Sequence, residues 1–262
     1  MKNFETITSR ANQKIRDASA LLQARERKKT GLFIAEGARL CEDAAINGTE
    51  ILRLFITKKA AETYSDIFSM LAESSKEVYF IDGAVAEKLS DTEASQNIFC
   101  VCRQRKSDIS FEDDGFYLMT DNIQNPDNLG ALSRSAEAFG AKGLIVSGGC
   151  DIYSPKALRA SMGALVRFPV VRTGNSAEKI TELKKLGFKA LACVPDSGAL
   201  DVRLADKSGK TVLVIGNEGA GISEEAKKEC TGLVTIPMAG RAESLNAAAA
   251  GAVMMWEFSG RK

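Results

Sequence analysis

The sequence predicts an α/β protein with two domains, and three observations support that prediction. Short apolar runs of strand length alternate with amphipathic helical segments along most of the chain. A charged stretch without sustained periodicity, residues 106–114, separates a first block, residues 1–105, from a second, residues 115–262. The strands of the second block are almost continuously apolar, which is typical of a parallel sheet buried on both faces.

The first block alternates helices and strands. Residues 12–29 carry apolar side chains at helical spacing, and residues 38–47 form a second predicted helix that ends at Gly48, a favourable place for glycine. The other predicted helices of this block are residues 60–74 and 84–89, and its predicted strands are residues 31–35, 51–57, 77–81 and 98–102. This order of elements predicts a small domain of three layers.

The second block begins with a strand and ends with a helix. Its predicted strands are residues 116–120, 143–146, 170–171, 189–194, 211–215 and 233–236. Its predicted helices run from an N-cap near Asp127 or Asn128 to Gly140, from Pro155 with Ser154 as N-cap, from 177 to 186, and from 244 to 258. The apolar run within the last helix is much shorter than the roughly 20 residues of a membrane span, so we expect a soluble protein with no membrane partner.

The composition narrows the possible classes of chemistry. With 45% hydrophobic and 26% charged residues, the chain falls in the ordinary globular range. Its start lacks the pattern of a secretory signal and its six cysteines form no Cys-x-x-Cys pair, so we expect reduced thiols in a cytoplasmic protein. The chain contains no histidine, which removes Ser–His and Cys–His nucleophile pairs and most zinc sites, and we expect no metal.

Charge is distributed unevenly along the chain. The formal net charge is only +1, but residues 1–30 hold eight basic side chains and three acidic ones, which gives 8 − 3 = +5. The basic residues are Lys2, Arg10, Lys14, Arg16, Arg25, Arg27, Lys28 and Lys29. Such asymmetry predicts either an end of the protein that faces a polyanion or a solvated helix face.

Three segments of the second block place polar residues where strands lead into helices, and ligands of open α/β sheets bind beyond the carboxyl ends of the strands. The first segment covers residues 120–135. It places Asn128 at the start of a helix and Arg134 six residues further on. An arginine within an otherwise apolar helix face must find anions or acceptors, and a structural salt bridge is the alternative to a functional role.

The second segment, residues 212–223, runs from a strand into a glycine-rich turn. It nearly fits a phosphate-binding loop, but Ile222 stands where the lysine belongs, and Glu218 adds negative charge where phosphates would lie. Such a turn permits close backbone approach while disfavouring phosphate. It suits a ligand without phosphates, such as the sulfonium cation S-adenosylmethionine, although a purely structural turn would look the same.

The third segment, residues 234–246, leads into the small residues 247–250. Ser244 and Asn246 stand at the predicted start of the last helix, where polar side chains cap free N–H groups. Capping accounts for Ser244 but leaves Asn246 unexplained. The small residues that follow allow the helix to approach another backbone closely.

In this order, the three segments resemble the SpoU (TrmH-like) family of RNA ribose 2′-O-methyltransferases, within the SPOUT superfamily. The resemblance covers the whole second block, including residues 151–156 and 158–163. More diffusely, residues 9–12, 35–37 and Ile51 resemble the substrate-binding domain of that family, which is similar to ribosomal protein L30e.

That family resemblance implies an L30e-like α/β/α domain followed by a Rossmann-like parallel sheet with a deep trefoil knot. It also implies S-adenosylmethionine as cofactor, bound in the knot, and a homodimer through the second domain that buries the knot. The small-residue helix over 247–255, together with Trp256, independently favours the dimer because it would otherwise leave a large apolar face in water.

The same resemblance identifies individual site residues. It places the catalytic residues at Asn128, Arg134, Glu218, Ser244 and Asn246, and the cofactor contacts at Gly216, Ile236 and Leu245. The family assigns activation of the 2′-hydroxyl to Arg134, but a pKa above about 12 makes arginine an awkward base. We therefore expect Arg134, with Asn128, to stabilise the developing alkoxide while Glu218 positions Asn246 or Arg134.

Substrate and role remain open at this stage. We expect 23S ribosomal RNA because family members with an L30e-like head usually act there, but a tRNA enzyme or a drug-resistance rRNA methyltransferase would use the same chemistry. A non-catalytic RNA-binding protein is the alternative outside this class, and a nucleotide-dependent α/β enzyme is disfavoured by the missing P-loop lysine. We expect residues 115–262 alone to bind the cofactor, and residues 1–105 to supply RNA affinity through the basic side chains from Arg10 to Lys29.

Overall fold

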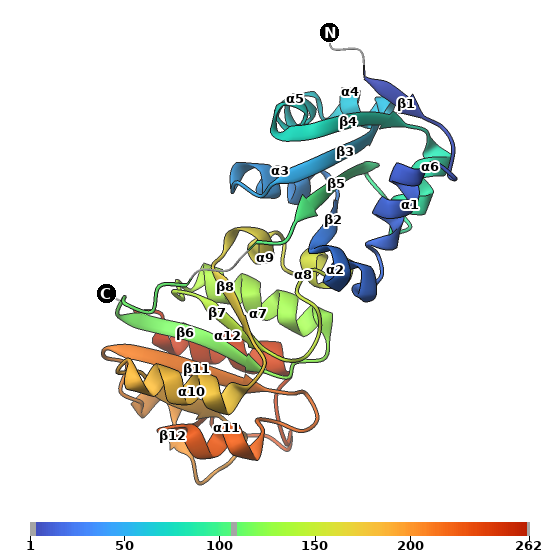
Figure 1. Ribbon diagram of the computed structural model, residues 1–262. Coiled ribbons are helices and arrows are strands. Elements are labelled where there is room, and N and C mark those ends of the chain that lie inside the picture. The colour runs from blue at the N-terminus through green and yellow to red at the C-terminus, as the bar shows by residue number, and fades with distance from the viewer. Residues whose placement is uncertain (1–3, 106–108, 261–262) are drawn as a thin grey trace. The chain divides into compact units, whose positions relative to one another are not determined.

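The computed structural model of the protein describes residues 4–105 and 109–260, so residues 106–108 of the predicted linker lie outside the described part. The described chain forms two compact units (Figure 1). The first contains residues 4–105 and also 153–167, and the rest belongs to the second. The predicted division assigns residues 153–167 to the second domain, whereas their contacts group them with the first.

The first unit is built on a mixed five-stranded sheet with the strand order β1-β4-β3-β5-β2. Its strands are β1 (Glu5–Ile7), β2 (Leu32–Glu36), β3 (Ile51–Thr57), β4 (Ser75–Ile81) and β5 (Ile98–Arg103), and its helices before residue 105 are α1 (Gln13–Ala20), α2 (Ala24–Thr30), α3 (Ala38–Ile46), α4 (Lys58–Thr63), α5 (Ser65–Ser74) and α6 (Gly83–Leu89). Helices α1 and α6 pack on one face of the sheet, and α3, α4 and α5 pack on the other. The alternation of strand side chains explains both cores, because Phe55 packs with α1 and α6 while the buried Leu54 and Ile56 face the opposite way. The predicted three layers are therefore present.

The predicted helix over residues 12–29 is two helices, α1 and α2. Arg27, which lies in α2, folds back toward the turn between them, so that its Nη1 donates to the carbonyl oxygens of Leu21 (2.8 Å) and Leu22 (2.9 Å). These carbonyls lie where α1 ends and have no intrahelical partner. Arg27 is only 3% exposed. The prediction that Arg27 contacts RNA is therefore wrong, because its guanidinium is buried and donates to backbone carbonyls within the first unit.

Residues 153–167 form α8 (Pro155–Ala160) and α9 (Ala164–Arg167), and they pack with the first unit. Tyr153 stacks on Phe33 with ring centroids 4.7 Å apart. Ion pairs of 2.8 Å join Arg159 to Asp91 and Arg167 to Asp43. The predicted N-cap is confirmed, because the Ser154 side chain accepts from the backbone N–H of Ala157.

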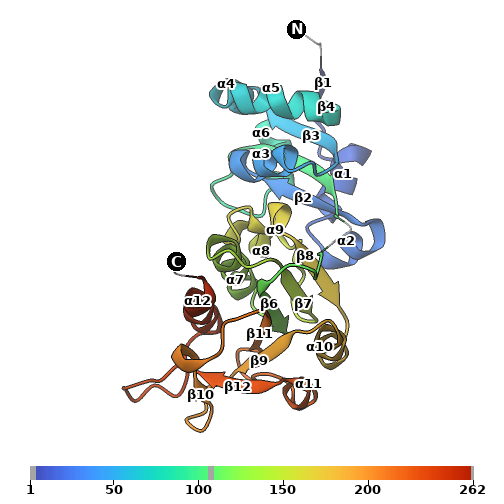
Figure 2. The ribbon, with the colours of Figure 1, turned by 90° about the vertical axis from the view of Figure 1, so that its left-hand side faces the viewer.

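The second unit is a seven-stranded parallel sheet with the order β10-β12-β9-β11-β6-β7-β8 (Figure 2). Its strands are β6 (Gly115–Asp121), β7 (Leu144–Ser147), β8 (Val170–Thr173), β9 (Lys189–Cys193), β10 (Leu200–Asp201), β11 (Lys210–Gly216) and β12 (Gly232–Thr235), and its helices are α7 (Pro126–Ala138), α10 (Ser176–Lys185), the short η1 (Val202–Leu204), α11 (Glu224–Glu229) and α12 (Ala247–Phe258). Helices α10 and α11 cover one face, and α7 and α12 pack together on the other. The predicted α/β class and parallel sheet are confirmed.

Two predicted helix starts need correction. Helix α7 begins at Pro126 and its N-cap is Asn125, which accepts from the N–H of Asp127, so neither Asp127 nor Asn128 is the cap. Proline at the first helical position fixes this start because it needs no hydrogen bond there. Helix α12 begins three residues later than predicted, after Asn246. Among the described residues, no helix combines the length and the apolar character needed to cross a membrane.

Candidate functional site

Three loops meet at the carboxyl edge of the second sheet. Because β6 and β11 are parallel neighbours with Gly216 beside Asp121, the loops that follow these two strands leave the sheet side by side. The third loop follows β12 and leads into α12. The three segments singled out in the sequence are thus brought together at one edge, where open α/β sheets bind their ligands.

The glycine-rich loop after β11 folds back tightly on itself. Asn217 and Gly221 exchange two backbone hydrogen bonds, of 2.9 and 3.0 Å, and the Asn217 side chain accepts from the N–H groups of Gly219 and Ala220. A Cβ atom on Gly216 would lie 2.2 Å from the backbone of Gly221 and Ile222, which is closer than any real side chain tolerates. Glycine at position 216 is therefore a steric requirement of the turn.

Glu218 points from this loop to the first turn of α7. Its Oε1 accepts from the N–H of Asn125 (3.0 Å) and from Nδ2 of Asn128 (2.8 Å), and its Oε2 accepts from the N–H of Gln124 (3.1 Å). Desolvation acts to raise the pKa of Glu218, but the hydrogen bonds from Asn128 and from backbone N–H groups outweigh it and leave the pKa below its ordinary value. Glu218 is therefore held as a carboxylate whose oxygens already accept hydrogen bonds.

Asn128 and Asn246 extend this contact into a chain of three side chains, which we call the Glu218 relay. Nδ2 of Asn246 donates to Oδ1 of Asn128 (3.0 Å), and Asn128 in turn donates to Glu218. Oδ1 of Asn246 caps α12 by accepting from the N–H groups of Ala248 and Ala249. The sequence predicts that capping explains Ser244 but not Asn246. This prediction is wrong, because Asn246 is the N-cap of α12.

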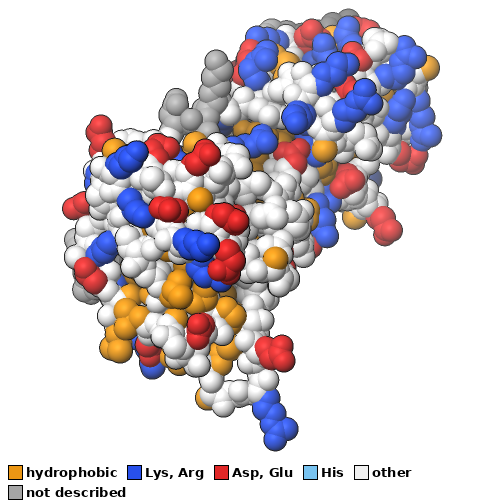
Figure 3. Space-filling model, turned by 60° about the horizontal axis from the view of Figure 1, so that its bottom comes forward, with side chains coloured by type: hydrophobic (Ala, Val, Ile, Leu, Met, Phe, Trp, Pro, Cys, Tyr) orange, Lys and Arg blue, Asp and Glu red, His pale blue; other side chains and the backbone are white. Residues whose placement is uncertain are grey.

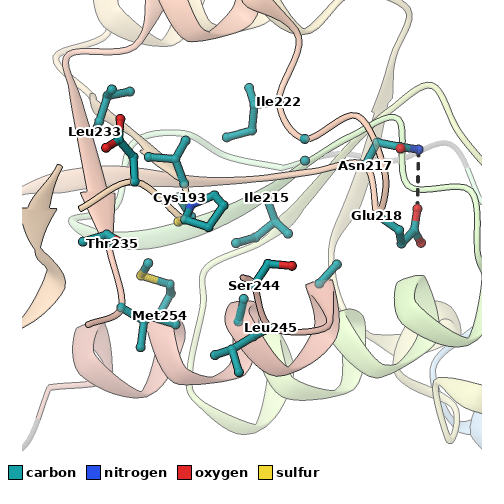
Figure 4. A pocket seen from close by; sticks show the side chains of 18 of the residues that line it. Cys193, Ile215, Asn217, Glu218, Ile222, Leu233, Thr235, Ser244, Leu245 and Met254 are labelled. Carbon is teal, nitrogen blue, oxygen red and sulfur yellow. Dashed lines mark hydrogen bonds between the residues drawn. The ribbon is translucent and has the colours of Figure 1, made fainter. Parts of the chain in front are cut away.

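A cavity of about 430 Å³ opens beside the relay, between the glycine-rich loop, the loop after β12 and α12. All three predicted cofactor contacts, Gly216, Ile236 and Leu245, line it, as do Glu218 and Ser244. Figure 4 shows Ser244, Leu245 and Met254 on the α12 side of this cavity and Ile222 and Asn217 across from them. Sequence reasoning missed Cys193 and Met254, which lie in apolar stretches and carry no motif signal.

Arg134 is the one predicted catalytic residue that lies apart from the others. It is exposed on α7 and does not line the cavity, and within the described chain its guanidinium contacts no acceptor. Six residues of helix turn the chain by about 240° beyond a full turn and advance it by about 9 Å, so Arg134 and Asn128 face different directions. Among residues 4–105 and 109–260, Arg134 therefore forms no structural salt bridge, which was the alternative to a functional role.

Comparisons with known proteins agree along the whole chain. Residues 115–256 match the SpoU rRNA Methylase family, and residues 12–100 match the MRM3-like substrate binding domain. The 23S rRNA (guanosine(2553)-2′-O)-methyltransferase RlmP of Bacillus subtilis is 30% identical over 98% of this chain and 100% of its own length. The 23S rRNA (uridine(2479)-2′-O)-methyltransferase of Streptomyces viridochromogenes is 32% identical over 96% of this chain and 90% of its own length.

Two solved structures show the same arrangement of elements. The AdoMet-bound rRNA methyltransferase from Sinorhizobium meliloti superposes with a TM-score of 0.87, at 30% identity, over 97% of each chain. The SpoU methyltransferase AviRb from Streptomyces viridochromogenes, in complex with AdoMet, gives a TM-score of 0.85 at 30% identity, over 95% of this chain and 97% of its own.

Proposed function

The chain belongs to the SpoU rRNA methylase family, and on this premise we propose that it transfers a methyl group from S-adenosylmethionine to a ribose 2′-hydroxyl of 23S ribosomal RNA. The observation that carries the proposal is the position of the Glu218 relay at the rim of the cavity. A cofactor site and a set of fixed amide donors thus share one edge of the sheet. Both relatives described above are named as 23S rRNA 2′-O-methyltransferases, which supports this substrate. We place the activity in the cytoplasm, with the ribosomal RNA.

The cavity fits S-adenosylmethionine in size and in chemistry. Its volume lies within the range of about 300–1,000 Å³ that is usual for small-molecule sites. The lining combines backbone of the glycine-rich loop with apolar side chains such as Leu245 and Met254, and its charged residues are Glu218, Asp196 and Lys227. Lys227 is paired with Glu224, so the acidic residues of the lining outweigh its one basic residue and favour a cation over a phosphate. The cofactor carries its transferable methyl group on a sulfonium cation.

The relay prepares the site by fixing side chains before the RNA arrives. Nδ2 of Asn246 donates one N–H to Asn128, and Nδ2 of Asn128 donates one N–H to Glu218. An amide nitrogen carries two N–H groups, so each of these residues has a second N–H to offer. These N–H groups are suited to orient the ribose and to stabilise charge that develops on the 2′-oxygen. Because Glu218 already accepts from backbone and side-chain donors, it orders the site and is a poor proton acceptor.

We propose that Arg134 acts in the site of a second copy of the chain. Its exposure and its absence from the cavity lining within one chain support a homodimer in which Arg134 of each copy serves the other copy's site. Figure 3 shows hydrophobic side chains gathered at the surface of the second unit. Val253 and Trp256 of α12 are 39% and 44% exposed. Burying them in a dimer removes apolar surface from water. In this position the guanidinium would stabilise the 2′-alkoxide as the methyl group arrives.

We further propose that the carboxyl-terminal chain is threaded as a trefoil knot and that the first unit is an L30e-like RNA-binding domain. The sheet order supports the threading, because the chain reaches β12 on the far side of β9 and then returns past β11 to pack α12 on α7. The match to a substrate binding domain over residues 12–100 supports the role of the first unit.

Binding and methylation experiments test the function directly. Calorimetry on the full-length protein is expected to show binding of S-adenosylmethionine and no binding of ATP or NAD. Incubation with 23S rRNA from a strain lacking the gene, followed by mapping of 2′-O-methylation, is expected to reveal one modified ribose, with Asn128→Ala as the inactive control. Methylation of tRNA instead of 23S rRNA would correct the substrate, and the absence of methyl transfer to either would overturn the proposal.

A further inference from the structure

The carboxylate of Asp121 is a buried charged group that the relay does not use. It lies at the carboxyl end of β6, in the middle of the second sheet, and the residue is 5% exposed. It does not line the cavity. Burying a carboxylate costs free energy unless hydrogen-bond donors surround it. The partners of Asp121 therefore indicate its role in the structure.

Each oxygen of Asp121 holds a different part of the structure. Oδ2 accepts from both the backbone N–H and the hydroxyl of Ser223, each at 2.8 Å. Oδ1 accepts from the hydroxyl of Ser176, the first residue of α10, and the Ser176 oxygen lies 2.8 Å from the Ser147 hydroxyl. One oxygen therefore holds the end of the glycine-rich loop, and the other holds α10.

Hydrogen bonds join both the start and the end of the glycine-rich loop to the residues that end β6. The carbonyl oxygen of Asn122, next to Asp121, accepts from Nδ2 of Asn217 at 2.9 Å near the start of the loop. Ser223 is attached to Asp121 at the other end. Residues 218–222, which line the cavity, lie between these two attachments.

We propose that Asp121 is a positioning residue for the cofactor site, which holds the glycine-rich loop at the height where its backbone contacts the cofactor. Hydrogen bonds to a carboxylate are stronger than those between neutral groups, and both bonds from Ser223 end on the same oxygen. Loss of the carboxylate leaves the N–H of Ser223 without its acceptor and frees one end of the cavity wall. This inference rests on the proposed function, because it assumes that the cavity binds S-adenosylmethionine.

Four full-length proteins test the proposal by calorimetry with S-adenosylmethionine. Asp121→Ala is expected to raise Kd by about tenfold relative to the wild type. Asp121→Asn is expected to raise it by only about threefold, because the amide oxygen can still accept from Ser223 while its nitrogen donates to the Ser176 oxygen. Ser176→Ala is the matched control, since it removes a partner of the same carboxylate without touching the loop, and its Kd is expected to equal that of the wild type.

Hydrogen exchange and thermal unfolding separate positioning from general stability. We expect faster exchange over residues 216–223 in Asp121→Ala than in Ser176→Ala, even where the two variants have the same Tm. If Asp121→Ala does not fold, Ser223→Ala takes its place and is expected to raise Kd by about threefold, because its N–H remains.

Either of two results would overturn the positioning role. The first is a wild-type Kd in a folded Asp121→Ala or, where that variant does not fold, in Ser223→Ala. The second is an equal rise in Kd for Ser176→Ala. A wild-type protein that binds no S-adenosylmethionine would instead count against the proposed function, so the two failures are distinguishable.

Discussion

The carboxyl edge of the second sheet and the outer face of α2 use polar side chains in opposite ways. At the sheet edge, Glu218, Asn128 and Asn246 direct their polar atoms at one another and at backbone N–H groups. On α2, Arg25 and Lys28 are exposed to water. Fixed dipoles favour catalysis because they cost no reorganisation during the reaction, whereas exposed charges attract phosphates over a distance. We therefore expect the sheet edge to serve the reaction and the α2 surface to attract RNA, so that each function can be altered separately.

The largest effect is expected from Gly216→Ala. Its new Cβ would lie 2.2 Å from the backbone of the same loop, so the cavity wall must move. A shift of about 1 Å at a site can cost on the order of a hundredfold, and we expect a loss of that size in affinity for S-adenosylmethionine by calorimetry. Gly219→Ala is the control from the same loop, because its Cβ would come no closer than 3.7 Å to Asn217. Equal affinities for the two variants would contradict this account of the turn.

The next largest effect is expected from Glu218→Gln, which keeps the shape and removes the charge. Both carboxylate oxygens accept from N–H groups, so the amide nitrogen of glutamine must face a donor whichever way it turns. We expect kcat to fall by roughly thirtyfold, from a cost of about 2 kcal/mol. Glu224→Gln, at an exposed carboxylate paired with Lys227, is the control and should keep wild-type kcat.

We expect the same carboxylate to set an acid limit for cofactor binding. Because the pKa of Glu218 in the folded protein lies below its ordinary value of 4.5, its ordering contribution is fully present above that value and is lost as the pH falls through the folded pKa. We expect Kd for S-adenosylmethionine to stay level from about pH 7 to about pH 5, when measured by fluorescence or calorimetry. A rise in Kd well above pH 5 would point to a different titrating group.

A smaller and more selective effect is expected from replacing Arg25, Lys28 and Lys29 with alanine. RNA affinity should weaken, and the salt dependence should flatten by about 0.7 to 0.9 for each phosphate that is no longer neutralised. Cofactor affinity should stay unchanged. The double variant Lys58→Ala and Lys59→Ala removes exposed charges from α4, across the sheet from α1, and is the control. An unchanged salt slope in the triple variant would show that the α2 surface is a solvated helix face that does not contact RNA.

Arg27→Ala should have the opposite profile to the triple variant. Removing its guanidinium leaves the carbonyls of Leu21 and Leu22 without a donor, which we expect to cost about 1 to 3 kcal/mol of unfolding free energy in urea. The salt slope of RNA binding should not change. Arg25→Ala, two residues away on the surface, should alter the unfolding free energy by less than about 0.5 kcal/mol. A flatter salt slope for Arg27→Ala would show that this residue contacts RNA after all.

Most strands were predictable because they are short apolar runs bounded by turn residues, and β3 has the bounds that its sequence indicates. The order of three polar segments was sufficient to predict the family and the position of the cavity. Periodicity could not separate α1 from α2, because Ile15 and Ala18 continue in phase into Leu21 although the helix ends there. Nor could it detect the edge strands β1 and β10, which are only a few residues long.

The finer features of the site depend on contacts between residues far apart in the chain. Whether Ser244 or Asn246 caps α12 depends on where the loop after β12 joins the helix, and both residue types are good caps. The importance of Asp121 is visible only when β6 and β11 are neighbours, because its partner Ser223 is 102 residues away in the chain. Local patterns carry no information about either interaction.

The packing of α8 and α9 has a consequence for dividing the protein in two. A cut between residues 105 and 109 would give an amino-terminal piece and a longer piece that still carries residues 153–167. That segment belongs with the first unit, where Tyr153 stacks on Phe33 and Arg159 pairs with Asp91. The two pieces should therefore reassemble when expressed together, as a split protein does, because α8 and α9 of the longer piece would bind the amino-terminal piece. Expressed alone, the longer piece would expose Tyr153 and the apolar side of α8 to water.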